Sequence, residues 1–263
     1  MTALKTLLLT SAAILPALLS SCSKDDDDTI SMGEVSRGIE KVMTIQGKDT
    51  IFVDAVDLGL PSELLWATCN IGANQPQESG HFFAWGETET KKEYNYATYA
   101  HSQGDDFTFT KYAPKTVDGK RNERLAPDFD GDDKSRLEKA DDAASVTYGD
   151  GWFMPTQKDF GELIYRTTKR YGKLNGVPGI LFTSNMPGYQ DRSIFLPMAG
   201  RKDYDRTFNE GSYGFYWSAD RYGTTEAHIL WLDYTVKVPN VTDDTRERYL
   251  GLPVRPVTYG SDE

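Results

Sequence analysis

Carboxylate side chains alternate along one short segment of the chain, from Asp128 to Asp133. Oxygen ligands at every second position suit Ca²⁺, so Asp128, Asp130 and Asp132 are candidate metal ligands. A calcium-binding helix–loop–helix would need Gly at its sixth position and Glu at its twelfth, where this chain has Asp133 and Lys139. The same acids are also favourable ahead of a helix. The sequence therefore leaves a calcium site and a charged helix start as alternatives.

A second candidate site is a tyrosine-rich stretch that contains Tyr94, Tyr96 and Tyr99. Exposed aromatic rings can stack on the faces of sugars, and tyrosine adds a polar tip for hydrogen bonding. These three tyrosines are therefore candidate ligand-binding residues for a glycan. The alternative is that their rings pack a surface loop onto the body of the protein.

Residues for covalent or metal-assisted catalysis are sparse. The three histidines, His81, His101 and His228, have none of the spacings typical of metal ligands. Cys69 lies in an apolar segment typical of a buried structural thiol, and nothing local supports a Cys–His pair. With 40 Asp and Glu residues, chance pairs of carboxylates are too common to indicate glycoside hydrolysis. The sequence favours a non-enzymatic protein.

Composition and charge exclude one class of partner. The 263 residues include 29 Lys and Arg against 40 Asp and Glu, which gives a net charge of −11. Such a chain is repelled by a phosphate backbone, so nucleic acid is excluded as a partner. An apolar fraction of 38% with 12% aromatic residues still suffices for a hydrophobic core.

The N-terminus indicates export. An apolar run from Leu7 to Leu19 follows Lys5, and at ~1.5 Å per residue it is too short to span a bilayer core of about 30 Å. Residues 1–21 are therefore predicted to be a signal peptide. The run ends in Leu19-Ser20-Ser21-Cys22, which resembles a bacterial lipobox. The resemblance implies that Cys22 is lipidated and attaches the protein to a membrane, stably if it carries more than one acyl chain.

The segment after Cys22 predicts a tether. Four adjacent carboxylates, Asp25 to Asp28, repel one another and cannot pack. Residues 22–50 hold few large apolar groups and are predicted to be an acidic linker. Ser23, Lys24 and the acidic run also resemble the surface-export signal of Bacteroidetes lipoproteins. That resemblance implies an outer-membrane lipoprotein that faces the cell exterior.

From Ile51 to Tyr259 the chain predicts one strand-rich domain, with residues 260–263 as a tail. Short apolar runs bounded by turn residues indicate strands. They are found near residues 51–60, 64–67, 180–182, 194–196, 214–218, 227–234 and 250–254. Alternation of Leu230 and Leu232 with Ile229 and Trp231 makes both faces of one strand apolar, which favours burial.

Two helices are predicted. Thr156 and Asp159 have the spacing of a capping box, and Phe160, Leu163 and Ile164 then fall on one helix face. This helix is predicted to start at residue 156 and to stop near Gly172. A shorter helix is predicted within residues 134–145. The fold class predicted from these elements is α+β with strands dominant.

Eight sequence blocks, in order, resemble the Fibrobacter succinogenes major paralogous domain family. They cover residues 56–62, 65–73, 83–88, 141–144, 151–156, 194–200, 211–218 and 254–257. The resemblance spans about residues 51–257 and implies a C-type-lectin-like fold, with a twisted antiparallel sheet, one or two helices and long irregular loops. It also implies an exported or surface protein without a defined activity. All five tryptophans, Trp66, Trp85, Trp152, Trp217 and Trp231, are expected in the core, and the first four lie in these blocks.

Departures from the family pattern are informative. Glu63 stands where relatives carry Gly, which implies a different turn or local strain. Phe153 replaces a usual Arg. The polar segment 91–139 is hardest to align, and variable loops are where such a scaffold carries specificity. No Glu-Pro-Asn motif of the sugar-binding C-type lectins is present.

The sequence thus predicts a surface-anchored lipoprotein that presents a non-enzymatic binding domain for a glycan or protein ligand. A structural component of a surface fibre or complex is the alternative. An uncharacterised enzyme is a third hypothesis, which a cleft with converging carboxylates would support.

Overall fold

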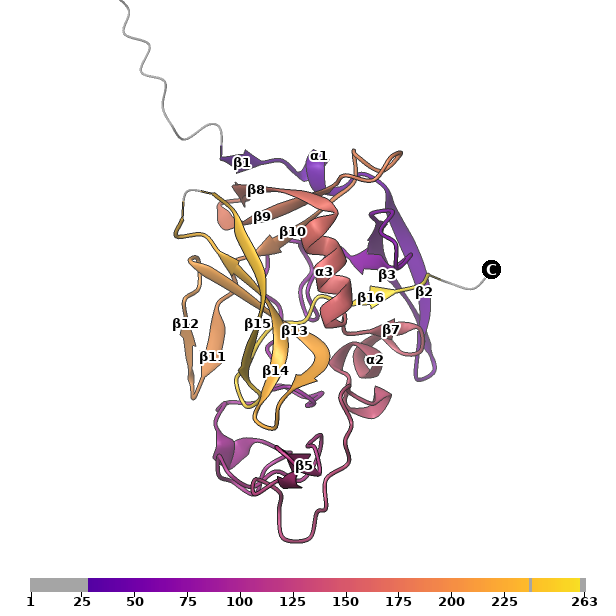
Figure 1. Ribbon diagram of the computed structural model, residues 1–263. Helices are drawn as coiled ribbons and strands as arrows, with labels where there is room; N and C mark the ends of the chain where they lie inside the picture. Colours follow the sequence, from indigo (N-terminus) through magenta and orange to yellow (C-terminus); the bar gives the residue numbers. More distant parts are fainter. Residues whose placement is uncertain (1–27, 237, 261–263) are drawn as a thin grey trace, which may run out of the picture.

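The computed structural model describes residues 28–236 and 238–260, which fold mostly into β-strands. Several antiparallel sheets pack together with a few short helices, and one sheet curls like half a barrel (Figure 1). The prediction that strands dominate is confirmed. The helices contribute so little that the fold is described better as mostly β than as α+β.

The largest sheet of the described residues has five strands. In spatial order they are β2 (Ile39–Gln46), β3 (Asp49–Asp57), β4 (Leu65–Ala67), β16 (Val257–Thr258) and β7 (Trp152–Phe153). Both outer strands, β2 and β7, contact helix α2 (Ala143–Tyr148), so the sheet closes round this helix. Val42, Ala55 and Trp152 form a buried cluster inside the curve, with Tyr148 of α2 against it.

A second sheet holds the start of the chain. Its strands, in spatial order, are β1 (Thr29–Ile30), β8 (Thr167–Leu174), β9 (Val177–Ser184) and β10 (Ser193–Pro197). β1 runs parallel to β8, and the short helix α1 (Met32–Val35) follows it. Ile30 and Val35 are buried together with Leu174, Leu181 and Phe195. We call residues 28–38 the N-terminal arm.

The prediction that residues 22–50 form a linker is therefore wrong for residues 29–50. These residues form β1, α1, β2 and the start of β3. Few apolar side chains are present there, but Ile30 and Val35 suffice to fix the segment, because both are buried against side chains of β8, β9 and β10. Residues 22–27 of the predicted tether lie outside the described residues, as do the predicted signal peptide and most of the predicted tail.

Gly172 makes room for the arm. A Cβ atom at this position would lie 2.6 Å from the carbonyl oxygen of Asp28 and from the Ile30 side chain. We expect Gly172→Ala to displace the arm and to lower the free energy of unfolding by about 2–4 kcal/mol, because Ile30 and Val35 would lose their burial. Urea unfolding measures this loss. Gly161→Ala in helix α3 (Gln157–Tyr165), where nothing lies within 4 Å of the added methyl, should be neutral or slightly stabilising. Equal losses in both variants would contradict the expectation.

The third sheet is antiparallel and consists of β13 (Tyr213–Tyr222), β14 (Glu226–Asp233) and β15 (Asn240–Glu247). A register shift between Trp217 and Arg221 bends β13. Two small hairpins accompany the sheets: β5 (Thr116–Val117) with β6 (Lys120–Arg121), and β11 (Arg201–Asp203) with β12 (Arg206–Phe208). The predicted last strand at residues 250–254 is instead an extended segment with isolated bridges to Phe83 and Lys202.

Helix α3 (Gln157–Tyr165) confirms the predicted start and corrects the predicted end. The Thr156 side chain accepts from the backbone N–H of Asp159, and the Asp159 carboxylate accepts from the N–H of Thr156 at 2.8 Å. The helix ends before Gly172 because residues 167–174 pair with β9 along their whole length and bury Leu174. The shorter predicted helix begins later than expected, at α2, after the 3-10 helix η2 (Lys139–Asp141).

The core contains four of the five tryptophans. Trp66, Trp85, Trp152 and Trp217 are almost completely buried, as predicted, whereas Trp231 is only half-buried. Trp85 and Trp217 fix two segments reciprocally: the indole N–H of Trp85 donates to the carbonyl of Ser218, and that of Trp217 donates to the carbonyl of Phe83, each at 2.8 Å. Such paired bonds satisfy both buried indoles.

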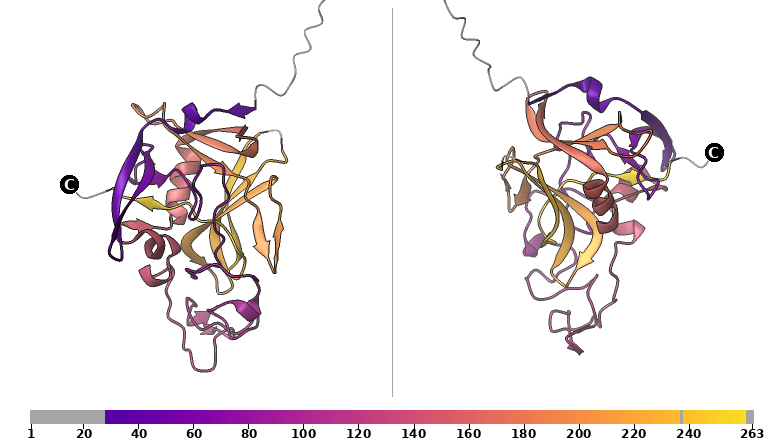
Figure 2. Two further views of the ribbon diagram at one scale, coloured as in Figure 1. Left: turned by 180° about the vertical axis from the view of Figure 1, so that it is seen from behind. Right: turned by 45° about the horizontal axis from the view of Figure 1, so that its top comes forward.

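Segment 91–139 forms the end of the molecule opposite the N-terminal arm. Figure 1 shows β1 and α1 at the top and the loops around β5 at the bottom, and the left view of Figure 2 agrees. We call this opposite end the loop tip. It contains the 3-10 helix η1 (Tyr96–Thr98) and its own apolar cluster, with Tyr94, Tyr99 and Phe109 in the centre. The loop tip is therefore packed onto the body rather than hanging from it.

Candidate functional site

The predicted ligand-binding tyrosines belong to the core of the loop tip. Tyr94 is 1% exposed and Tyr99 is 3% exposed. The Tyr99 hydroxyl donates to the carbonyl of Trp85 at 2.8 Å, and the half-buried Tyr96 ring packs on Tyr249 with their centroids 4.4 Å apart. The prediction of a glycan-stacking surface on Tyr94, Tyr96 and Tyr99 is therefore wrong. The alternative, that they pack the loop onto the body, is what the structure shows.

The predicted calcium ligands do not converge. Asp132 caps backbone groups, because its carboxylate accepts from the N–H groups of Tyr112 and Ala113 at 2.9 and 3.0 Å. The Asp130 side chain is 97% exposed. Across residues 28–236 and 238–260, no group of three or more His, Cys, Asp or Glu side chains is placed to hold a metal ion. Asp128, Asp130 and Asp132 thus form no calcium site in this structure, and Asp132 instead shapes the loop.

Other residues singled out in the sequence lie apart from one another. Cys22 is outside the described residues, so its lipidation stays a prediction. Cys69 is a free, half-buried thiol. His228 lies on β14 with its Nδ1 atom 3.4 Å from a carboxylate oxygen of Asp243.

No helix in the described part of the chain is long and apolar enough to cross a membrane.

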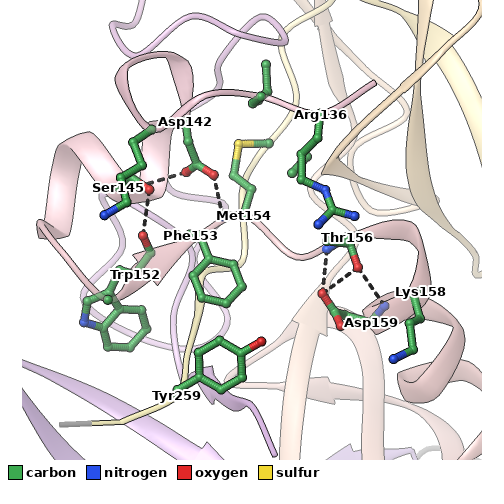
Figure 3. Close-up of a pocket in the computed structure, with 14 residues that line it drawn as sticks. Arg136, Asp142, Ser145, Trp152, Phe153, Met154, Thr156, Lys158, Asp159 and Tyr259 are labelled. Carbon is green, nitrogen blue, oxygen red and sulfur yellow. Dashed lines mark hydrogen bonds between the residues drawn. The ribbon is translucent and has the colours of Figure 1, made fainter. Parts of the chain in front are cut away.

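A cavity of about 500 Å³ lies where α2, β7 and the start of α3 meet (Figure 3). Its floor is apolar and is made by Leu137, Met154 and Ala219, which are buried. Phe153 and Tyr259 form one wall, with ring centroids 5.6 Å apart and planes tilted by 41°. The Tyr259 side chain is 68% exposed. An exposed aromatic wall over an apolar floor is typical of a ligand site.

Asp142 holds the α2 side of the cavity in shape. Its carboxylate accepts from the N–H groups of Ala144 and Ser145 at the start of α2, and from the N–H of Met154 after β7, at 2.9–3.0 Å. Burial raises the pKa of Asp142, although these three backbone donors favour the ionised form. The Ser145 hydroxyl adds a bond to the carbonyl of Trp152 at 2.7 Å. Helix and strand are therefore joined by side chains that face the cavity.

Asp220 and Asp159 hold the α3 side. The Asp220 carboxylate accepts from Nε of Arg136 and from the N–H of Gln157, each at 2.8 Å. Asp159 is buried and engaged in the capping box with Thr156. This arrangement fixes Arg136 at its Nε atom and leaves its side chain 59% exposed beside the cavity.

Two further cations surround the cavity. Lys139 and Lys158 have side chains that are about four-fifths exposed, at 80% and 81%. Each has an acidic partner, the exposed Asp150 for Lys139 at 3.1 Å and the mostly buried Glu162 for Lys158 at the long distance of 3.8 Å. Such exposed pairs are weak and exchange readily. The ammonium groups can therefore donate to oxygen atoms of a bound ligand.

The wall formed by η2 is attached to the loop tip. Asp141 accepts hydrogen bonds from the Lys111 ammonium and the Tyr112 hydroxyl. Burial alone would raise the pKa of Asp141, but these two donors lower it below its ordinary value. The cavity is thus built on segments that several long-range contacts hold in place.

The sequence did not point to this cavity. Phe153 stood out only as a difference from the family that the sequence resembles, and Tyr259 is the last residue of the predicted domain. Neither was a candidate binding residue in the sequence, and only the pairing of β16 with β7 brings Phe153 and Tyr259 together. The one signal in the sequence was that the resemblance implied a charged side chain where this chain has the aromatic ring of Phe153.

His101 makes stability depend on pH. Its ring is packed between Tyr99 and Tyr112, and its Nε2 donates to the carbonyl of Gly86 at 2.8 Å. Burial lowers the pKa of His101 below 6.5, so the unfolded chain binds a proton more readily than the folded one. The free energy of unfolding should therefore fall as pH drops from about 6.5 toward the pKa of His101 in the folded protein. Below that pKa, His101 causes no further loss of stability.

The test is urea unfolding of the wild type and of His101→Gln between pH 7.5 and 5, with the range chosen around the ordinary histidine pKa of about 6.5. Glutamine can still donate to the Gly86 carbonyl but does not titrate. The variant should lose less stability than the wild type over this range. Parallel curves would show that His101 does not contribute.

No protein-family model matches the chain, and no curated protein or solved structure matches it either. Function must therefore be argued from the cavity and from the chain's own residues.

Proposed function

We propose that this protein is a surface-anchored outer-membrane lipoprotein whose folded domain binds a glycan, or a glycan-bearing protein, in the cavity beside Phe153 and Tyr259. The observation that carries the proposal is the exposed tyrosine ring, backed by Phe153, over an apolar floor. An aromatic face can stack on the apolar face of a sugar ring. Arg136, Lys139 and Lys158 surround it with donors for hydroxyl or carboxylate oxygens.

Membership of the Fibrobacter succinogenes major paralogous domain family, with a C-type-lectin-like fold, is part of the proposal. Its support is that the eight blocks include much of the buried core, including Trp66, Trp85, Trp152 and Trp217. Antiparallel sheets with short helices and a long loop excursion are compatible with such a fold. The lipobox-like sequence at Cys22 and the acidic run after it support surface anchoring.

The carboxylates of the cavity support binding rather than catalysis. Asp142 uses both oxygens for backbone N–H groups, and Asp159 is engaged in capping α3. Hydrolysis of a glycosidic bond needs one carboxylic acid and one free carboxylate that face the bond to be cleaved. These two side chains serve the scaffold instead, and the exposed groups that remain at the cavity are cations and aromatic rings.

Tyr259→Ala should weaken glycan binding without unfolding the domain, because Tyr259 is mostly exposed. Loss of one stacking ring costs about 0.5–1.5 kcal/mol, or up to roughly tenfold in Kd. The measurement is a glycan array with non-acylated mature protein, residues 23–263, followed by titration calorimetry with the sugar that binds. The N-terminal arm must be kept, because Ile30 and Val35 are part of the core.

The matched control is Tyr165→Ala on α3, where an 82% exposed tyrosine lies outside the cavity lining. It should bind as the wild type does. Binding that survives Tyr259→Ala, or that is lost equally in both variants, would refute the cavity as the site. Running the array with and without Ca²⁺ also tests the calcium ligands predicted at Asp128, Asp130 and Asp132.

A structural role in a surface complex is the second candidate, and one observation favours it. On the hairpin of β2 and β3, Met43 and Phe52 are directly paired and 52% and 62% exposed, with Ile45 beside them. β2 is also an edge strand. Exposed apolar side chains on an edge strand are a typical contact surface between proteins. Silence on the array combined with stable co-purification of other surface proteins would favour this role.

A further inference from the structure

The chain is fixed to the body from its first described residue. The carbonyl of Asp28 accepts from the N–H of Lys173 at 2.7 Å, and β1 then pairs with β8. Ile30 is 2% exposed and Val35 is 3% exposed. Glu34 in α1 forms an ion pair with Arg170 in β8. The N-terminal arm is therefore part of the folded domain and adds nothing to the reach of a tether.

The length of chain before the arm limits how far the domain can stand from an anchor at Cys22. At most ~3.3–3.6 Å per residue, the six residues from Cys22 to Asp28 span about 20 Å. A tether that ran to residue 50 would span about 95 Å by the same measure. A folded domain of this size is roughly 45 Å across. The tether is thus much shorter than the domain that it carries.

The arm and the loop tip lie at opposite ends of the molecule, as all views show (Figures 1 and 2). Exposed basic side chains surround the arm: Arg37 follows α1, Arg166 ends α3, and Lys173 lies on β8. Among the residues that the structure describes, none of these three forms an ion pair; the acids on and beside the arm are Asp28, Glu40 and Asp191, which are exposed, and Glu34, which is paired with Arg170. The arm end can therefore approach phosphate-bearing headgroups.

We propose that the arm end of the domain, formed by α1, β8 and the end of α3, is a docking surface for the lipid headgroups of the outer membrane. This inference rests on the proposed anchor at Cys22. The short tether keeps this end against the membrane, and Arg37 and Arg166 contact headgroup phosphates. The loop tip then points outward, and the cavity beside Tyr259, which lies between the two ends, stays open to ligands.

The test measures which end of the domain lies at the membrane. Full-length acylated protein is inserted into vesicles of phosphatidylethanolamine and phosphatidylglycerol that contain a lipid with a nitroxide headgroup, a short-range quencher. In a Cys69→Ala background, a fluorophore is attached at Lys173→Cys near the arm or at Lys120→Cys in the loop tip; both native lysines are exposed. We expect loss of fluorescence at position 173 and none at position 120.

A flexible insertion of 20 residues between Asp27 and Asp28 is the control, because it adds up to about 70 Å of reach. It should relieve the quenching at position 173. Equal quenching at positions 173 and 120 in acylated protein would overturn the docking surface alone. The same conclusion would follow if neither the insertion nor the Arg37→Ser, Arg166→Ser double variant reduced the quenching at position 173. Absence of acyl chains on Cys22 by mass spectrometry would overturn the anchor, and the orientation with it.

Discussion

Arg248→Met should lower the free energy of unfolding by about 3–5 kcal/mol and release the loop tip from the body. Arg248 is fully buried, and its guanidinium donates to three backbone carbonyls and one hydroxyl. The carbonyls belong to Lys111, Tyr112 and Thr224, at 2.9–3.0 Å. Methionine fills the volume but leaves these acceptors buried without donors, which costs about 1–3 kcal/mol each before relaxation.

The guanidinium also lies among aromatic rings, which makes Arg248 harder to replace. Its central carbon is 4.9 Å from the Trp85 ring centroid and 5.1 Å from that of Phe109. Arg248→Lys keeps a cation over the rings but loses the planar fork, so an intermediate loss is expected. Hydrogen exchange of the amides in segment 91–139 reports the release of the loop tip directly.

Arg246→Met is the matched control for Arg248→Met. Arg246 is two residues away and forms a partly exposed pair with Asp244 at 2.6 Å. Its loss should cost about 1 kcal/mol or less. If Arg248→Met is no more destabilising than Arg246→Met, or if exchange in segment 91–139 is unchanged, then the buried arginine does not hold the loop tip.

Arg255→Met should be at least as damaging and should affect the whole fold, with an expected loss of about 3–5 kcal/mol. Arg255 is fully buried and donates to the Asn70 side chain at 2.9 Å and to the carbonyls of Ala67, Thr68 and Phe195 at 3.0–3.2 Å. It thereby joins the end of β4 to β10. Burial lowers the pKa of Arg255, but the guanidinium stays charged at neutral pH.

A double-mutant cycle of Arg255→Met with Asn70→Ala isolates one of these bonds. Asn70 is itself buried and donates to the carbonyl of Ser79 at 3.0 Å, so its own loss should also be destabilising. We expect a coupling energy of about 1–3 kcal/mol between the two positions. Additive losses, or an Arg255→Met protein that unfolds at the same urea concentration as the wild type, would show that the guanidinium does not join the two sheets.

Both arginines show how a polar side chain can specify this fold. Each guanidinium is surrounded by carbonyl oxygens and amide or hydroxyl groups rather than by a carboxylate. A planar group with five donors can satisfy several backbone acceptors that no strand partner reaches. In a chain with many loops, Arg248 and Arg255 therefore replace part of the hydrogen bonding that regular sheets would supply.

The elements that the sequence predicted correctly depend on neighbours in the chain. The start of α3 follows from Thr156 and Asp159, three residues apart, because a capping box is a local structure. The strand β14 follows from the alternation of apolar side chains between Ala227 and Leu232. Glu63, where the resemblance implied a Gly, adopts a φ of +58°, in the left-handed region that favours Gly.

The predictions that failed depend on residues far away in the chain. Tyr99 was predicted to be a surface aromatic because one of its hydrogen-bond partners, Arg248, lies 149 positions later in the chain. Residues 29–50 looked like a linker because the side chains that bury Ile30 and Val35 belong to β8, β9 and β10. Asp132 looked like a metal ligand because its hydrogen-bond partners are distant in the chain. They are the backbone N–H groups of Tyr112 and Ala113, 20 and 19 positions earlier.

The sequence by itself determined local features of this protein: where helix α3 begins, that strands form near β10, β13 and β14, and that Trp66, Trp85, Trp152 and Trp217 belong to the core. Tertiary structure alone decided which polar side chains are buried, where the cavity beside Phe153 and Tyr259 lies, and that the N-terminal arm belongs to the domain. Local structure is fixed by residues within about four positions of one another. Burial and cavities are fixed by contacts between sheets, whose members the chain brings together only when it folds.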